Sequence, residues 1–132
     1  MSFSDLRAHT GLTVSEVAEL RRICFNGCEE KDGHLFYKGN DTGKYAQTSF
    51  KFRNVHFHMN KAQLSLFLKL IDSGISMEEW GESMQTSHLC HKKACLKQEH
   101  LNLESSEENR QRDECKRLNR CTGHKDLPNC LL

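Results

Sequence analysis

Cysteines and histidines gather in the C-terminal part of the sequence at spacings that suit metal binding. Cys90, Cys95 and His100 are separated by four residues each, so a tight loop can bring two thiolates and an imidazole onto one tetrahedral zinc ion. The fourth ligand must come from upstream, where the candidates are Cys24 and Cys28. We favour Cys28, because it follows a glycine in a predicted turn, whereas Cys24 lies on the apolar stripe of a predicted helix.

A second set of ligand-type residues follows within sixteen residues, and it is complete in itself: Cys115, Cys121, His124 and Cys130. Three thiolates and one imidazole are typical of a structural zinc site. The alternative is that some of these residues are only buried or exposed thiols. Seven cysteines is an odd number, which argues against a closed disulfide framework and favours zinc binding in a reducing, intracellular compartment.

Two further polar residues lie in a predicted strand–loop–strand–helix unit and are not needed by either zinc site. His88 ends or follows the first strand, the second strand covers 101–104, and a capping box at 105–108 opens a helix that continues to about Arg112. Asn109 falls in the first turns of this helix. A histidine can act as a general base on water, and an amide oxygen can bind a hard divalent cation. The alternative is a surface pair or a hydrogen-bonded core pair.

Upstream of this unit, apolar periodicity predicts further helices. One covers about 14–25 and begins with a capping box. A second begins at Asn60 and stops at Gly74, and a short third one follows a capping box at 76–79.

Short strands with turn residues between them are predicted at 34–38, 45–52 and 55–58. Phenylalanines alternate with Lys51 and Arg53, so one face of an antiparallel sheet is apolar and the other is basic. No Asp or Glu occurs from 42 to 71. The net charge of the whole chain is only +1, but this segment contains basic residues and no acidic ones.

Length and composition indicate one α+β domain. The 132 residues contain no window near eighteen consecutive apolar residues and begin without a basic or apolar leader, so we expect neither a membrane span nor a secretory signal. We divide the domain into an N-terminal helix with the first zinc ligand at 1–30, a sheet at 33–60 and the cysteine-rich part at 87–130. A domain this small has a small hydrophobic core, so bound metal ions add stability to it.

The cysteine-rich part resembles the His-Cys box of the small zinc-bound, intron-encoded homing endonucleases, which are His-Me finger (ββα-metal) nucleases. The resemblance covers 87–130. It departs from the family at 96–99, where relatives often have a proline before the third ligand, and we expect the loop rather than the ligands to change. The matching residues are Ser87, His88, Leu89, Cys90, His91, Cys95, His100, Leu101, Glu104, Ser105, Asn109, Arg112 and Cys115.

The resemblance implies a homodimeric endonuclease that cuts double-stranded DNA with one Mg²⁺ or another divalent cation. His88 matches the general base and Asn109 matches the magnesium ligand. The residues of the two predicted zinc sites match the family's two structural zinc sites, the first being completed by an upstream cysteine. We expect the protein to be intracellular, in the nucleus.

In the family, an antiparallel sheet upstream of the box enters the major groove of DNA, and a basic side chain on it contacts the cleaved phosphate. The basic segment of this chain lies at the corresponding place. A run of charges is otherwise usually a solvated face. The candidates for phosphate or base contacts are Lys44, Gln47, Ser49, Lys51 and Arg53.

Two rival functions use the same scaffold. One is a zinc-stapled module that binds nucleic acid or regulates without cleaving, and the other is a degradative nuclease with little sequence preference. Retention of both His88 and Asn109 favours an enzyme. The sequence ends two residues after Cys130, so we expect no C-terminal tail exchanged across a dimer, and hence either a small interface or a nicking monomer.

Overall fold

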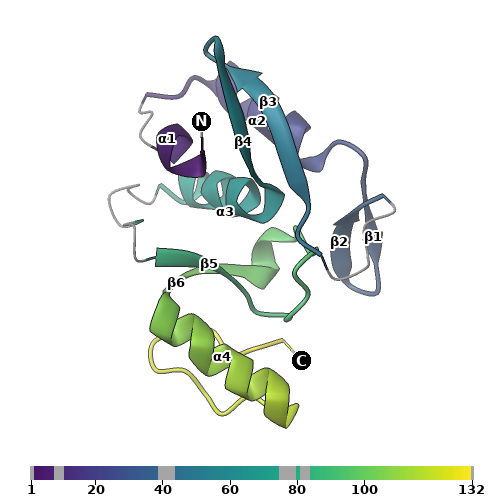
Figure 1. Cartoon of the computed structure of the whole chain (residues 1–132), viewed down its shortest axis with the longest axis vertical. Coiled ribbons are helices and arrows are strands. Elements are labelled where there is room, and N and C mark those ends of the chain that lie inside the picture. The colour runs from purple at the N-terminus through teal and green to yellow at the C-terminus, as the bar shows by residue number, and fades with distance from the viewer. Residues whose placement is uncertain (1, 8–10, 39–43, 75–79, 81–83, 132) are drawn as a thin grey trace.

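A computed structural model describes residues 2–7, 11–38, 44–74, 80 and 84–131 of the chain, and the statements below concern these residues (Figure 1). The predicted α+β class is confirmed: short helices surround three two-stranded antiparallel sheets. The elements are α1 (Phe3–Arg7), α2 (Val14–Phe25), β1 (Cys28–Lys31), β2 (His34–Tyr37), β3 (Gln47–Phe52), β4 (Val55–Asn60), α3 (Lys61–Asp72), β5 (Met84–His88), β6 (Leu101–Ser105) and α4 (Ser106–Leu118).

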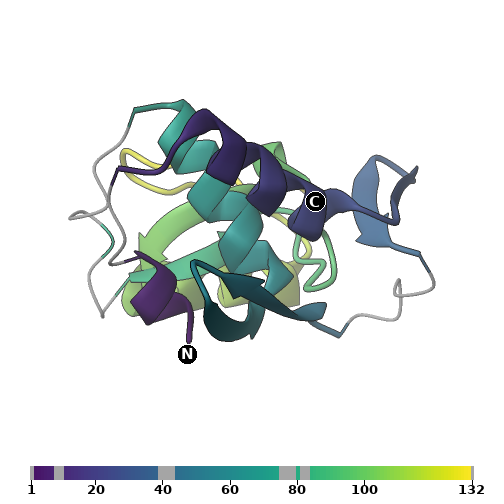
Figure 2. The same cartoon turned by 90° about the horizontal axis from the view of Figure 1, so that it is seen from above.

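Helix α3 is the centre of the core. Leu64, Leu66, Phe67 and Leu68 are completely buried, because other elements cover the helix on several sides, as Figure 2 shows from above. The predicted cap is confirmed: the Asn60 side chain accepts a hydrogen bond from the N–H of Ala62 and closes a capping box.

Helix α2 has the predicted bounds, and its N-terminal capping box is present. Helix α1 was not predicted, because its five residues are too few to show a period. Phe3 meets Phe67 edge to face with ring centroids 5.9 Å apart, and the Arg7 guanidinium donates to the carbonyl oxygen of Trp80. The helix predicted after the capping box at 76–79 lies outside the described residues.

Strands β3 and β4 form a ribbon with the predicted apolar face; of the two predicted cations of the other face, Lys51 is exposed on β3, whereas Arg53 lies in the turn outside the strand. Phe50 and Phe52 of β3 and Phe57 of β4 are buried against the core. The strand residues that alternate with these phenylalanines lie on the opposite face of the ribbon, where most of them are exposed. In the pairing of the two strands, Ser49 lies opposite His58. The ribbon turns at Arg53 and Asn54, both with positive φ.

The C-terminal unit has the predicted strand–loop–strand–helix order. Strands β5 and β6 pair antiparallel, with His88 opposite Leu101, and α4 packs across them (Figure 1). The Ser105 side chain caps α4 and Glu108 closes the capping box. The helix continues to Leu118, beyond the predicted end near Arg112, and stops at Asn119 in the left-handed conformation.

In the described ranges, no helix combines the length and the apolar character that a membrane crossing requires.

Candidate metal centres and catalytic groove

The structure brings His34, Cys90, Cys95 and His100 together. The four possible ligand atoms all lie within 4.8 Å of one another. Cys95 Sγ and His100 Nδ1 are 3.5 Å apart. Zn–S bonds of about 2.3 Å and Zn–N bonds of about 2.0–2.1 Å at tetrahedral angles put sulfur and nitrogen about 3.5 Å apart. The group therefore fits one zinc ion with two thiolates and two imidazoles.

His34 takes the place that we assigned to Cys28, which corrects the predicted ligand set. Cys28 begins β1 opposite Tyr37, whereas His34 lies at the turn end of the same hairpin, opposite Lys31. Three residues of strand separate the two ends by roughly 10 Å. The Cys28 thiol donates instead to the Cys24 carbonyl oxygen, 3.7 Å away. Spacing along the chain missed His34, because only the pairing of β1 with β2 orients it.

Cys24 stays out of both groups, as predicted. It is completely buried, its thiol donates to the carbonyl oxygen of Lys61 at 3.5 Å, and burial raises its pKa to about 12. A thiol with so high a pKa keeps its proton and acts as a small apolar core residue.

The loop that carries Cys90 and Cys95 is fixed to the β1–β2 hairpin. The backbone N–H of Leu96 donates to the carbonyl oxygen of Leu35 at 2.7 Å. Phe36, with Ala94 and the two cysteines, forms a small buried cluster under the loop. A hydrogen bond from the Cys90 thiol lowers the pKa of Cys95, which favours the thiolate form that a metal ion requires. The buried Nδ1 of His34 has no hydrogen-bond partner.

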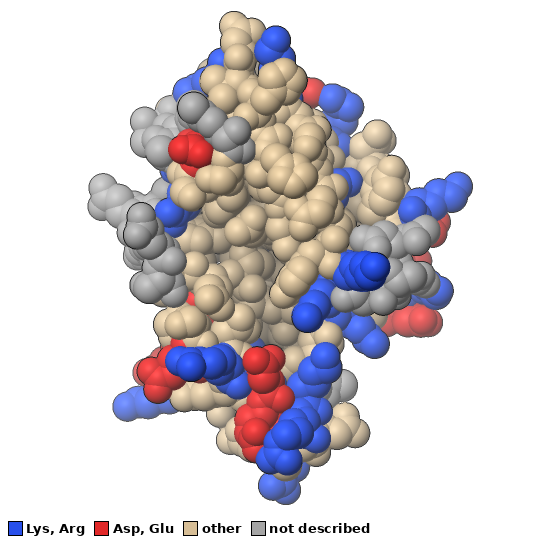
Figure 3. Space-filling view, in the orientation of Figure 1, with Lys and Arg blue, Asp and Glu red and all other residues tan. Residues whose placement is uncertain are grey.

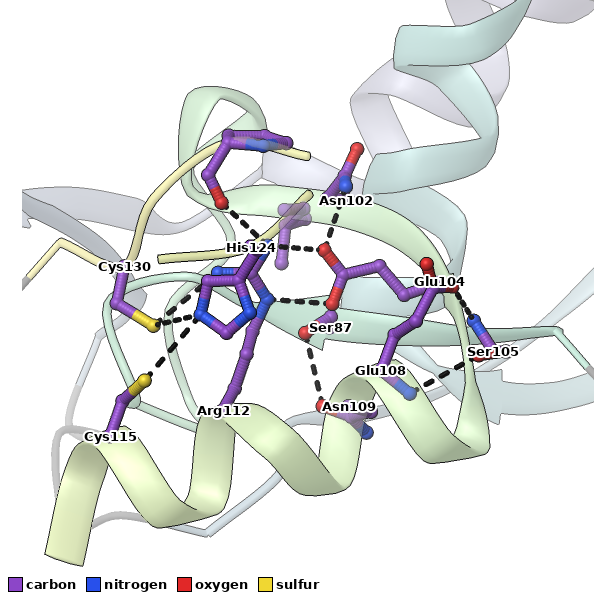
Figure 4. A network of polar contacts seen from close by, with 12 residues as sticks. Ser87, Asn102, Glu104, Ser105, Glu108, Asn109, Arg112, Cys115, His124 and Cys130 are labelled. Atoms are coloured by element: carbon purple, nitrogen blue, oxygen red, sulfur yellow. Dashed lines mark hydrogen bonds and ion pairs between the residues drawn. The ribbon is translucent and has the colours of Figure 1, made fainter. Parts of the chain in front are cut away.

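The second predicted ligand set also comes together: Cys115, Cys121, His124 and Cys130. His124 Nε2 lies 3.5 Å from Cys115 Sγ and 3.4 Å from Cys130 Sγ, close to the sulfur–nitrogen edge of a tetrahedral zinc site. Figure 4 shows both sulfurs turned toward the imidazole. Cys115 is on α4, and the other three residues follow the helix in a segment without regular structure.

Three sulfurs of this second group accept hydrogen bonds from N–H donors. The backbone N–H of Thr122 donates to Cys115 Sγ at 3.4 Å, and that of Cys130 donates to Cys121 Sγ at 3.3 Å. The Arg112 guanidinium donates to Cys130 Sγ at 3.3 Å. Donors directed at sulfur stabilise the thiolate form that a metal ion requires.

Arg112 joins this second group to the strand–helix unit. Its side chain is 1% exposed and donates to the completely buried carboxylate of Glu104, with Nε 2.6 Å from Oε1. It also donates to the carbonyl oxygen of Pro128. Burial alone would raise the pKa of Glu104, but hydrogen bonds, that of Arg112 first, outweigh it and leave the pKa lowered. The pair is therefore ionic at neutral pH.

His88 lies at the end of β5 and is nearly buried. Its Nε2 is 3.1 Å from the carbonyl oxygen of Cys95. A carbonyl oxygen only accepts, so Nε2 carries the proton and Nδ1 keeps a basic lone pair. Burial lowers the pKa of His88, which favours the neutral imidazole.

Asn109 lies on α4 and faces β5 (Figure 4). Its Oδ1 accepts a hydrogen bond from the Ser87 hydroxyl at 3.0 Å, and its Nδ2 donates to Gln85 Oε1 at 3.0 Å. An amide oxygen has two lone pairs, so one remains for a cation. Sequence reasoning did not single out Gln85 or Ser87 as site residues.

His88 and Asn109 line the same groove. Two adjoining hollows of about 260 and 200 Å³ share these two residues together with Tyr45 and Thr86. The Tyr45 ring centroid is 5.9 Å from that of His88, and Lys93 Nζ lies 5.5 Å from the centroid of the Tyr45 ring. In the view of Figure 3, the middle of the molecule is hollowed and mostly uncharged, Lys and Arg lie to the right of the hollow, and side chains of both charges lie below it. Tyr45 and Lys93 were not predicted as site residues.

The candidate DNA contacts lie mostly on one surface. Gln47, Ser49 and Lys51 are exposed on β3, and Lys44 is exposed just before Tyr45 of the groove. Arg53 is different, because its guanidinium pairs with the Glu16 carboxylate of α2 at 2.7 Å.

Comparison with known families gives one finding. A family model described as the zinc-binding loop region of homing endonuclease matches residues 23–130. Searches of curated proteins and of solved structures returned no match.

The first prediction concerns the fourth ligand of the first group. We expect His34→Ala to bind one zinc ion per chain where the unmodified chain binds two, because three remaining ligands hold zinc weakly. Cys28→Ala is the matched control and keeps both. Native mass spectrometry counts the bound zinc, and loss of one ion from Cys28→Ala but not from His34→Ala would restore the original assignment.

The second prediction concerns the buried ion pair. Arg112→Met leaves the Glu104 carboxylate buried without its cation, so the free energy of unfolding falls by about 3–5 kcal/mol. Denaturant titration at fixed zinc concentration measures it. Arg117→Met removes an exposed ion pair with Glu114 of the same helix and changes stability little. Equal losses in the two variants would show that the buried pair has no special role.

Proposed function

Because the chain belongs to the homing endonuclease family defined by its zinc-binding loop region, we propose that it is an endonuclease that hydrolyses phosphodiester bonds of double-stranded DNA with a divalent cation, Mg²⁺ foremost. The observation that carries this proposal is the convergence of His88 and Asn109 on one groove of the β5–β6–α4 unit. The two Cys/His groups hold structural zinc ions and leave the groove free for chemistry.

In the proposed reaction, His88 is the general base. The hydrogen bond from Nε2 to Cys95 fixes the tautomer, so Nδ1 takes the proton of the water that attacks the phosphorus in line. Cys95 belongs to the first metal group, and the same loop therefore orients the base. The products carry a 5′ phosphate and a 3′ hydroxyl.

Asn109 is the protein ligand of the catalytic cation. The free lone pair of its Oδ1 suits a hard ion, which keeps several waters and takes its other ligands from the substrate. When bound, Mg²⁺ stabilises the charge that develops on the phosphate and on the leaving 3′ oxygen. Asn109 supplies a neutral oxygen held by two hydrogen bonds.

The β3–β4 ribbon is the proposed DNA-reading surface. A two-stranded ribbon fits the major groove of B-DNA, and the exposed side of this one carries Lys51 beside hydrogen-bonding groups. Ser49 Oγ and His58 Nδ1 are 2.7 Å apart on that side, so His58 is held for contact through its other nitrogen. Lys93 lines the groove, and Lys44 directly precedes Tyr45 of the same groove. In the proposal these two lysines contact phosphates near the cleaved bond.

Cutting both strands in one binding event requires two active centres, so the proposal includes a homodimer on a duplex site. An intracellular, nuclear location belongs to the same proposal, because all seven cysteines are free and five of them are placed for metal binding.

The third prediction is a cleavage assay on supercoiled plasmid with Mg²⁺. His88→Ala and Asn109→Ala should each lower the rate by about 10²–10⁴-fold while binding as much zinc as the unmodified chain. Asn26→Ala, at an exposed position at the end of α2, serves as the control with unchanged rate. Gel electrophoresis follows nicked and linear products over time.

Each product pattern of that assay has a distinct meaning. A linear band from a plasmid with one site indicates a dimer, and nicked circles alone indicate a monomer. A smear indicates the degradative nuclease. Absence of cleavage by the zinc-loaded chain, together with tight DNA binding, would replace the proposal by the non-catalytic module.

The fourth prediction tests the ribbon. Lys51→Ala should weaken DNA binding and lower the slope of log affinity against log salt by about 1, because one phosphate contact is lost. Lys38→Ala changes an exposed lysine outside the ribbon and should leave the slope unchanged. Fluorescence anisotropy at several salt concentrations gives both slopes, and equal slopes for the two variants would exclude Lys51 from the interface.

A further inference from the structure

Both polar atoms of the Asn109 side chain are held by one strand. The Ser87 hydroxyl donates to Oδ1, and Gln85 Oε1 accepts from Nδ2, each at 3.0 Å. Gln85 and Ser87 are two residues apart on β5 and therefore project to the same side of the strand, which is the side that α4 covers. We call these two side chains the amide clamp.

The amide clamp holds the Asn109 side chain at both ends, and its Gln85 end favours one of two orientations of the amide. Rotation by 180° about the terminal bond exchanges oxygen and nitrogen at nearly the same positions. The rotated amide would present an NH₂ group, which repels a cation. The Ser87 hydroxyl can donate to an oxygen or accept from an NH₂ group, so it tolerates either orientation. Rotation would instead set the Asn109 oxygen against Gln85 Oε1, and the hydrogen bond from Nδ2 to Gln85 would be lost.

One end of the amide clamp is anchored in a buried polar network (Figure 4). Ser87 is completely buried and lies opposite Asn102 in the β5–β6 register. Asn102 Nδ2 donates to Glu104 Oε2 at 2.8 Å, and Glu104 is paired with Arg112. Because the polar groups around Ser87 are buried and have hydrogen-bond or ion-pair partners, the position of Ser87 is fixed. Gln85 is exposed and closes the clamp from the solvent side.

We propose that Gln85 and Ser87 are positioning residues, which hold the Asn109 amide with its oxygen available to a divalent cation at the groove. The inference rests on the proposed function only for the role of the cation. The clamp itself is a statement about the side chain of Asn109.

The fifth prediction tests the clamp without any reaction. In ¹H–¹⁵N NMR spectra of the zinc-loaded chain, the side-chain NH₂ signals of Asn109 are identified by their loss in Asn109→Ala. Their hydrogen exchange should be about fivefold faster in Gln85→Met and in Ser87→Ala, because each variant removes one hydrogen bond. Gln85→Glu keeps an acceptor oxygen and should retain the protection. Gln111→Met, at an exposed position of α4, is the matched control.

A cleavage titration with Mg²⁺ provides the second readout. Gln85→Met should raise the Mg²⁺ concentration for half-maximal rate by about fivefold and keep most of the maximal rate. Zinc counts verify that each variant is folded, and Gln85→Met changes an exposed side chain, so the test does not depend on tolerance of Ser87→Ala.

The outcomes separate the two proposals. Exchange rates that are equal in all variants overturn the clamp. A changed exchange rate with an unchanged Mg²⁺ midpoint overturns the positioning role. If the NMR result is as expected but Asn109→Ala cleaves normally, the clamp stands and the assigned role of Asn109 in catalysis fails.

Discussion

The buried guanidinium of Arg112 is the contact on which the C-terminal third of the chain depends. It donates to the Glu104 carboxylate of β6, the Pro128 carbonyl and the Cys130 sulfur. Removing such a cation from water costs several kcal/mol unless partners surround it. Strand, helix and tail can therefore satisfy Arg112 only together, which explains how a segment with few apolar residues keeps one arrangement.

The two Cys/His groups each connect two parts of the fold. The first ties the β1–β2 hairpin to the loop between β5 and β6, and the second ties α4 to the segment that follows it. Zinc with two thiolates and two imidazoles is neutral, whereas zinc with three thiolates and one imidazole carries a net negative charge. The Arg112 cation lies beside the negative site. Both groups brace the β5–β6–α4 unit from outside and leave the groove to His88 and Asn109.

The sequence predicted those structural features that depend on residues close together in the chain. The caps at Thr13, Asn60 and Ser105 and the two faces of the β3–β4 ribbon follow from neighbouring residues, and the structure has them. The second metal group also follows from spacing, because its members are close along the chain. The role of His34 could not be predicted in this way. Its position depends on the register of the β1–β2 hairpin and on a hydrogen bond between Leu35 and Leu96, two residues that are distant in sequence.

If the groove holds the proposed catalytic cation, its polarity favours an ion that arrives with the substrate. Among the described residues that line the two adjoining hollows, Asp113 is the single carboxylate, and three cations share the lining with it: Lys93, Arg112 and Lys116. The carboxylate of Glu104 is nearby, but Arg112 neutralises it. A neutral amide is a weak ligand for a hard divalent ion on its own. In the proposed endonuclease, DNA phosphates would therefore supply most of the attraction for the ion, and the orientation of one amide oxygen would decide where the ion rests.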